Sequence, residues 1–205
     1  WDHVSWQDRL LARDAAWAHR EMQRAQQRFT EVFGTAPRLH GAAGWQFSEA
    51  AARAEQALGF EYASDTRGTH PFVPAAADGT AIGPPQFPTS LPTLDELIGV
   101  DGVTADNAHR RVLASTEHAE QDQVYTLHAE LEGGLYLPAF EALLQGWQAQ
   151  GYRIGTMGDT AATLDLAARN RETVLWNAYL KASRQTERGA KGKPAAYAMS
   201  ARQHD

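Results

Sequence analysis

A histidine closely followed by a glutamate stands at the end of a short apolar run, Val124–Leu127, rich in β-branched and aromatic residues. Such a run predicts a buried strand over residues 124–129, with His128 and Glu130 at its carboxyl end. Catalytic side chains gather there in parallel α/β sheets, because the strand is rigid and the following loop opens the site. Imidazole holds and releases a proton near pH 7, so His128 is a candidate general acid. A histidine that only completes a core or its rim is the alternative.

A second predicted strand, residues 60–64, ends in Asp65 and leads into a long loop that contains Arg67 and His70. A hydrogen bond from His128 to the Asp65 carboxylate would orient the imidazole and favour its protonated form. The alternative is that Asp65 only caps the following turn. Arg67 could hold a phosphate or a carboxylate in a bidentate contact, or lie in solvent. His70 could line the site.

A glycine-rich turn over residues 41–44 separates His40 from Trp45. Trp45 is a candidate for stacking against a sugar ring, with packing in the core as the alternative. His40 adjoins the turn and could line the same site. Glu130 would contact substrate or form a salt bridge within the fold, and the sequence does not choose between these roles.

Three motifs connect these segments to a known family. They are Ser-Asp-Thr-Arg-Gly at 64–68, Gln-x-Pro-Thr-x-Leu-Pro-Thr at 86–93 and Leu-His-Ala-Glu at 127–130. Their order resembles the NodB-type polysaccharide deacetylase family. Within that family the likeness is to the deformylases of a formamido sugar linked to undecaprenyl phosphate. The resemblance covers roughly residues 1–165.

The resemblance implies a metal-dependent amide hydrolase that removes the N-formyl group from 4-deoxy-4-formamido-L-arabinose on undecaprenyl phosphate. It implies work at the cytoplasmic face of a Gram-negative inner membrane, in the lipid A modification that gives polymyxin resistance. By the same resemblance His128 is the general acid. We take Asp65 as its candidate partner and Arg67, Trp45, Glu130 and His70 as candidate substrate contacts. The alternatives are a peptidoglycan- or chitin-type N-deacetylase, or a non-catalytic fragment or paralogue that binds lipid-linked sugar.

The resemblance also implies a divalent metal (Zn, Mn, Co or Ni) held by two histidines and one aspartate, a ligand set suited to borderline metals. His3 matches the second histidine of the family's motif, and the first would lie two positions before Trp1. We therefore expect an N-terminally truncated chain with an incomplete metal site and no activity of its own. The family's arginine in the motif after the long helix is also missing here. Its position falls within residues 41–43, which leaves open what replaces the guanidinium.

Hydrophobic periodicity predicts an α/β fold. Helices at 14–33, 48–58, 93–98, 104–116, 138–150 and 159–169 alternate with strands at 60–64, 124–129 and 152–156. The resemblance implies that these strands lie parallel in an incomplete, distorted (β/α) barrel. We expect one catalytic domain over residues 1–169 and a basic, flexible tail over residues 170–205.

Composition narrows the function classes. The formal net charge of −6 argues against a nucleic-acid binder, and the absence of cysteine excludes disulfides and thiolate metal sites. Residues 181–205 nevertheless carry six Lys or Arg. Contact of this tail with an anionic membrane is one reading, and a solvated tail is the other.

Overall fold

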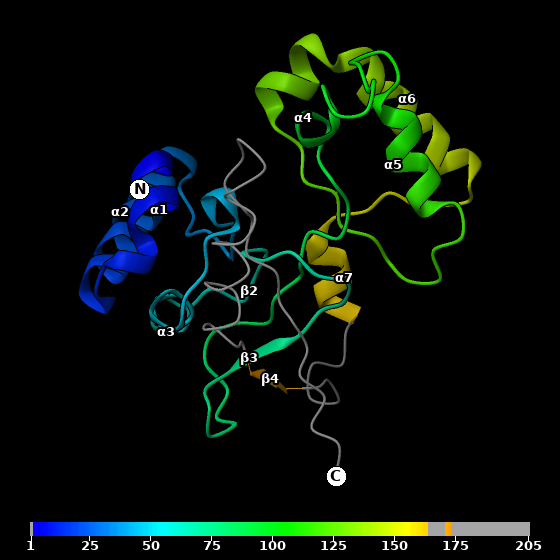
Figure 1. The fold of residues 1–205 in the computed structure, drawn as a ribbon. Helices are drawn as coiled ribbons and strands as arrows, with labels where there is room; N and C mark the ends of the chain where they lie inside the picture. The colour runs from blue at the N-terminus through cyan, green and yellow to red at the C-terminus, as the bar shows by residue number, and fades with distance from the viewer. Residues whose placement is uncertain (1, 164–170, 174–205) are drawn as a thin grey trace. The chain divides into compact units, whose positions relative to one another are not determined.

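The computed structural model describes residues 2–163 and 171–173 (Figure 1). The chain divides into two compact units. Unit 1 comprises Trp1–Pro88 and Asp165–Asp205, and unit 2 comprises Thr89–Leu164. The described residues include both helices and strands, which agrees with the predicted α/β class.

The longest helix of unit 1 is α2, Ala15–Phe33, close to the predicted 14–33. The Asp14 carboxylate begins it by accepting a hydrogen bond from the Trp17 amide at 2.8 Å. Gly34 ends it with φ of +75°, a left-handed conformation that glycine adopts without a side-chain clash. The sequence signals for this helix are confirmed at both ends.

The same kinds of signal bound α3, Glu49–Leu58, which begins after the Ser48 cap and ends at the left-handed Gly59. Its alanine-rich face packs against α2 and against the short helix α1, His3–Arg9. The buried core of unit 1 between these helices includes Trp6, Leu10, Met22, Phe47, Ala51 and Ile82.

The strands of unit 1 are short and parallel. β1, Leu39–His40, pairs with β2, Tyr62–Ala63, and His40 lies opposite Ala63. On the other side of β2, a parallel bridge joins Ala63 to Gln86. The three segments therefore end at one carboxyl edge, which is where open α/β sheets place their functional groups.

A second parallel pair joins β3, Val73–Ala75, to β4, Arg171–Thr173. The first described residues of the predicted tail are thus a strand. Residues 170 and 174–205 of that tail lie outside the described residues, as do residues 164–169 of the last predicted helix.

Unit 2 is built mainly from helices, and Figure 1 shows α5 and α6 side by side. Its core includes Leu91, Leu94, Val112, Leu143 and Trp147. The elements are α4 (Leu94–Leu97), α5 (Ala108–Thr116), the π-helical turn η3 (Leu131–Leu135), α6 (Leu137–Ala149) and α7 (Met157–Thr163).

The predictions of strands at 124–129 and 152–156 are wrong, because neither segment joins a ladder among the described residues. The Val124 carbonyl accepts hydrogen bonds from the amides of Ser90 and Leu91, at 3.0 and 3.3 Å. A single carbonyl shared by two amides is a local contact, whereas a strand pair repeats its hydrogen bonds along both chains. The predicted sheet of strands 60–64, 124–129 and 152–156 is therefore not formed.

The predicted helix start at Thr104 is also wrong, since α5 begins at Ala108. The Asn107 side chain accepts from the Thr104 amide at 2.8 Å, and the Asn107 amide donates to the Thr104 carbonyl. Residues 104–107 therefore form a hydrogen-bonded turn that precedes α5. In the part of the chain that the structure describes, no helix is both long and apolar enough to cross a bilayer.

Candidate functional site

Four polar side chains from separate elements meet at the carboxyl edge of the β1–β2 pair. His40 ends β1, Asp65 follows β2, Gln86 lies in the neighbouring bridged segment, and Glu55 comes from α3. The His40 Nδ1 atom lies 2.8 Å from Glu55 Oε1 and 2.8 Å from Asp65 Oδ1. We call these four residues the buried cluster.

Gln86 completes the buried cluster from the other side of the two carboxylates. Its Nε2 donates to Asp65 Oδ2 at 3.1 Å and to Glu55 Oε2 at 3.4 Å. Its Oε1 accepts from the Asp65 backbone amide at 3.0 Å. Both carboxyl groups therefore have partners on both oxygens, as buried polar groups require.

Aromatic rings enclose the imidazole. Trp6 meets His40 edge-on with ring centroids 5.9 Å apart, and Phe60 lies at 5.6 Å. The side chains of Glu55 and Asp65 are fully buried, and that of His40 is 19% exposed. Water therefore screens the charges of the cluster only weakly.

The pKa values of the cluster are strongly coupled. Burial alone would lower the pKa of His40, but the Asp65 charge and hydrogen bonds to Asp65 and Glu55 outweigh it and raise it to about 10. Burial and the neighbouring Asp65 charge raise the pKa of Glu55 well above its usual value. Burial also opposes ionisation of Asp65, yet its pKa is lowered by the His40 charge and by hydrogen bonds from its neighbours. These shifts favour the charged form of His40, the ionised form of Asp65 and the neutral form of Glu55.

Such a donor set can hold either shared protons or a metal ion. One imidazole nitrogen and two carboxylate oxygens, all within 4.8 Å of one another, form the one group of three or more metal-ligand side chains in the described residues. Their chemistry suits a borderline divalent metal.

Sequence reasoning placed Asp65 and His40 near a site but missed Glu55 and Gln86. A signal for Glu55 was present, because it lies four residues after Ala51 and three before Leu58, on the buried alanine face of α3. A carboxylate on an apolar helical face needs a buried partner. Gln86 is the first residue of the motif at 86–93, but no role was assigned to it there.

Arg67 and Trp45 come together within unit 1. The Arg67 guanidinium lies over the Trp45 ring, 4.5 Å from its centroid, and Arg67 is only 7% exposed. Trp45 has φ of +51° at the end of the 3₁₀ turn η2, Ala43–Trp45. The contact is a cation–π interaction, so neither a solvated arginine nor a simple core tryptophan describes the pair.

The remaining candidates of unit 1 lie on its surface. His70 is exposed, with Nδ1 3.1 Å from the Thr69 hydroxyl. His3 is the first residue of α1 and is exposed. Within the described residues His3 belongs to no group of three or more close metal-ligand side chains. The local structure at His3 therefore does not fit a closed metal site.

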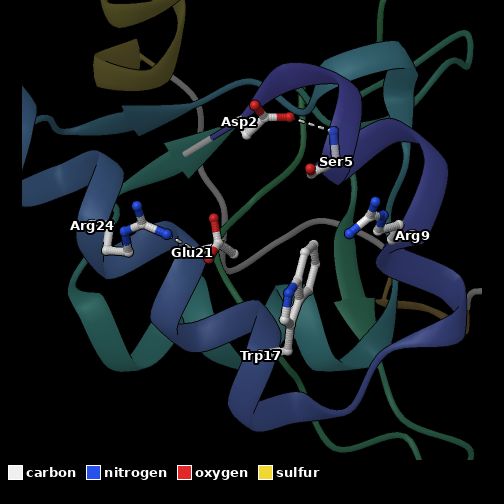
Figure 2. A pocket seen from close by; sticks show the side chains of 6 residues that line it. All are labelled: Asp2, Ser5, Arg9, Trp17, Glu21 and Arg24. Atoms are coloured by element: carbon white, nitrogen blue, oxygen red, sulfur yellow. Dashed lines mark hydrogen bonds and ion pairs between the residues drawn. The ribbon is translucent and has the colours of Figure 1, made fainter.

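Figure 2 shows a polar hollow of about 350 Å³ between α1 and α2. Its walls carry both charges. Glu21 pairs with Arg24 at 3.0 Å, and Asp2 accepts from the Ser5 amide at 2.6 Å as the cap of α1. The lining residues of the hollow are Asp2, Ser5, Arg9, Trp17, Glu21 and Arg24.

In unit 2, Glu132 holds the segment that carries His128. This fully buried carboxylate accepts from the His128 amide at 2.8 Å and from the Tyr125 hydroxyl at 3.0 Å. Burial first, and then the Glu132 charge, raises the pKa of Tyr125 well above its usual value. Sequence reasoning missed Glu132 and singled out Glu130, which is exposed.

The His128 ring faces Asp95, whose Oδ1 lies 3.3 Å from Nδ1. This is ion-pair distance, and among the described residues Nδ1 makes no hydrogen bond. The proposed pairing of His128 with Asp65 stays a prediction, because the two residues belong to different units.

Comparison with known proteins gives a consistent relationship. No protein-family model matches the sequence. The chain is 34% identical over 144 residues to a protein of Shewanella sediminis named as a probable 4-deoxy-4-formamido-L-arabinose-phosphoundecaprenol deformylase, ArnD, covering 70% of this chain and 45% of that protein. A protein of the same name from Wigglesworthia glossinidia brevipalpis is 30% identical over 145 residues, covering 70% of this chain and 50% of its own length. The chain thus spans about half the length of the curated relatives it matches.

A solved structure supports the fold. A protein from Mycobacterium smegmatis, named as a polysaccharide deacetylase, superimposes with a TM-score of 0.59 at 17% identity, over 82% of this chain and 63% of that one. The chain is therefore similar in sequence to two proteins named as sugar deformylases, and in fold to a protein named as a polysaccharide deacetylase.

Proposed function

We propose that the protein containing this chain is a metal-dependent sugar deformylase. Its substrate would be 4-deoxy-4-formamido-L-arabinose linked to undecaprenyl phosphate. The observation that carries the proposal is the 34% identity to a named deformylase over 144 residues. The fold would be the family's distorted (β/α) barrel, to which the carboxyl edge at His40, Ala63 and Gln86 contributes three neighbouring segments.

The reaction is the hydrolysis of an amide. Water adds its hydroxyl to the formyl carbon, the C–N bond breaks, and the departing amine takes a proton, which gives formate and the free amino sugar. A bound divalent metal would polarise the formyl carbonyl and favour attack by water near neutral pH. His3 is the ligand that we propose from this chain; since its surroundings do not complete a site, no step is assigned to the metal here.

The remaining roles belong to side chains of this chain. His128 would protonate the amine. Asp65, at the carboxyl edge of β2, would orient the His128 imidazole and favour its protonated form. Arg67, stacked on Trp45, would face the sugar phosphate, and Glu130 and His70, both exposed, would reach the same substrate. We propose that the enzyme works at the cytoplasmic face of the inner membrane, where the basic tail would meet anionic lipid.

The direct test measures formate release from the lipid-linked formamido sugar by the natural protein that contains this chain, with added Zn²⁺, Mn²⁺, Co²⁺ or Ni²⁺. We expect metal-dependent turnover that a chelator abolishes. Turnover of chitin or peptidoglycan oligomers in place of the lipid-linked sugar would favour the deacetylase alternative. Binding of the lipid-linked sugar without formate release would favour a non-catalytic paralogue.

A further inference from the structure

We propose that His40 is a positioning residue, a buried cation that fixes the Asp65 carboxylate through shared protons, and that the buried cluster is not where a metal binds. The inference rests on the proposed function only in the role given to Asp65. The contacts that carry it lie entirely within unit 1.

The distances favour protons over a metal ion. Both carboxylate oxygens lie 2.8 Å from His40 Nδ1, which is hydrogen-bond length. Ligands bound at about 2.0–2.2 Å around a tetrahedral metal stand roughly 3.4 Å apart, so a metal would have to push this cluster open. The outer carboxylate oxygens are held at the same time by the Gln86 amide, which resists such an expansion.

The charges of the cluster balance when it holds protons. Two carboxyl groups and one imidazole converge, and a proton on Glu55 and a charge on His40 leave Asp65 as the single anion. Asp65 is held between His40 and Gln86. Two residues later, the Arg67 guanidinium lies over the Trp45 ring.

His40 also answers a question that the sequence leaves open. Residues 41–43, a glycine and two alanines, carry no charge. The adjacent residue, His40, brings a positive charge to Asp65 instead, and its backbone carbonyl accepts from the Ser64 amide at 2.9 Å. A side-chain contact and a backbone contact thus hold the same turn.

The test compares His40→Gln, Asp65→Asn and the double variant in the full chain, without substrate or metal. His40→Gln leaves Asp65 as an unpaired buried anion, so we expect at least a tenfold lower folding equilibrium constant. The double variant removes both charges and should recover most of that loss. If the double variant instead loses as much stability as the two single variants together, His40 only fills space, and the proposal is overturned.

Two further measurements, neither of which needs His40→Gln, keep the proposal falsifiable if that variant does not fold. The ¹⁵N shifts of His40 should show both ring nitrogens protonated at pH 8, where the exposed His3 and His70 serve as internal controls. A neutral His40 ring at that pH contradicts the proposal. Calorimetric titration with Zn²⁺ should give the same isotherm for the unmodified chain and for Glu55→Gln. A tight site that Glu55→Gln weakens tenfold or more would make the cluster a metal site. A failed deformylase assay leaves all of these outcomes unchanged, so the two proposals can fail separately.

Discussion

Removing the Glu132 carboxylate should release the His128 segment. Glu132→Ala leaves two half-buried donors without their acceptor, the His128 amide and the Tyr125 hydroxyl. An unsatisfied buried donor costs about 1–3 kcal/mol, and a half-buried one lies at the lower end because water can reach it, so the expected loss is about 2–3 kcal/mol of unfolding free energy for unit 2. Glu132→Gln is the matched control, because its amide oxygen still serves the His128 amide while its NH₂ can donate to the Tyr125 oxygen. We expect it to cost about 1 kcal/mol.

The assay is urea unfolding combined with hydrogen exchange at the His128 amide, which reports on this segment whether or not the two units unfold together. Exchange should become faster in Glu132→Ala and change little in Glu132→Gln. Tyr125→Phe should cost less in the Glu132→Ala background than in the unmodified chain, because one stranded donor is then gone. If Glu132→Ala and Glu132→Gln have equal stability and equal exchange, Glu132 is not the anchor of His128.

Three further outcomes follow from the site. The folded-state pKa of His40 is raised to about 10, so the stability that its charge contributes is fully present below about pH 6.5 and is lost as the pH rises through 10. The midpoint of urea unfolding should therefore fall across that pH window. A midpoint that does not change would contradict the charge assigned to His40. The exposed, single imidazole of His3 should give only weak Zn²⁺ or Mn²⁺ binding in this chain, and a sub-micromolar one-to-one site in calorimetry would refute this. In the natural protein, His128→Ala should lower formate release by about 10²–10⁴ with little change in substrate binding, and full activity would remove His128 from the mechanism.

Local rules explain which parts of the fold could be predicted. Asp14, Gly34, Ser48 and Gly59 bound their helices as the sequence indicates, because each acts on a backbone group within a few residues. The strand predicted at 124–129 depended instead on a partner far away in the chain. Its apolar pattern describes burial, and burial alone does not supply the repeated backbone hydrogen bonds of a sheet.

The candidate site was predictable only in part, for a similar reason. His40, Asp65 and Arg67 were visible because they stand beside turn residues after predicted elements. Their partners were not, since a contact such as Gln86 to Asp65 joins residues 21 apart in sequence through the register of neighbouring segments. Glu55 is the exception, as a lone carboxylate among buried alanines already indicated a buried partner.

The pairing of β3 with β4 makes unit 1 discontinuous in the chain. Ala75 and Arg171 lie on paired strands, so closing them spans on the order of 95 residues and costs about 4 kcal/mol of chain entropy beyond a constant. The contiguous unit 2 lies within that span, and its prior folding would shorten the effective loop. During synthesis unit 1 cannot complete this pair until residue 173 has emerged. High contact order of this kind makes β4 a late and slow addition to a unit whose α2–α3 core is already available.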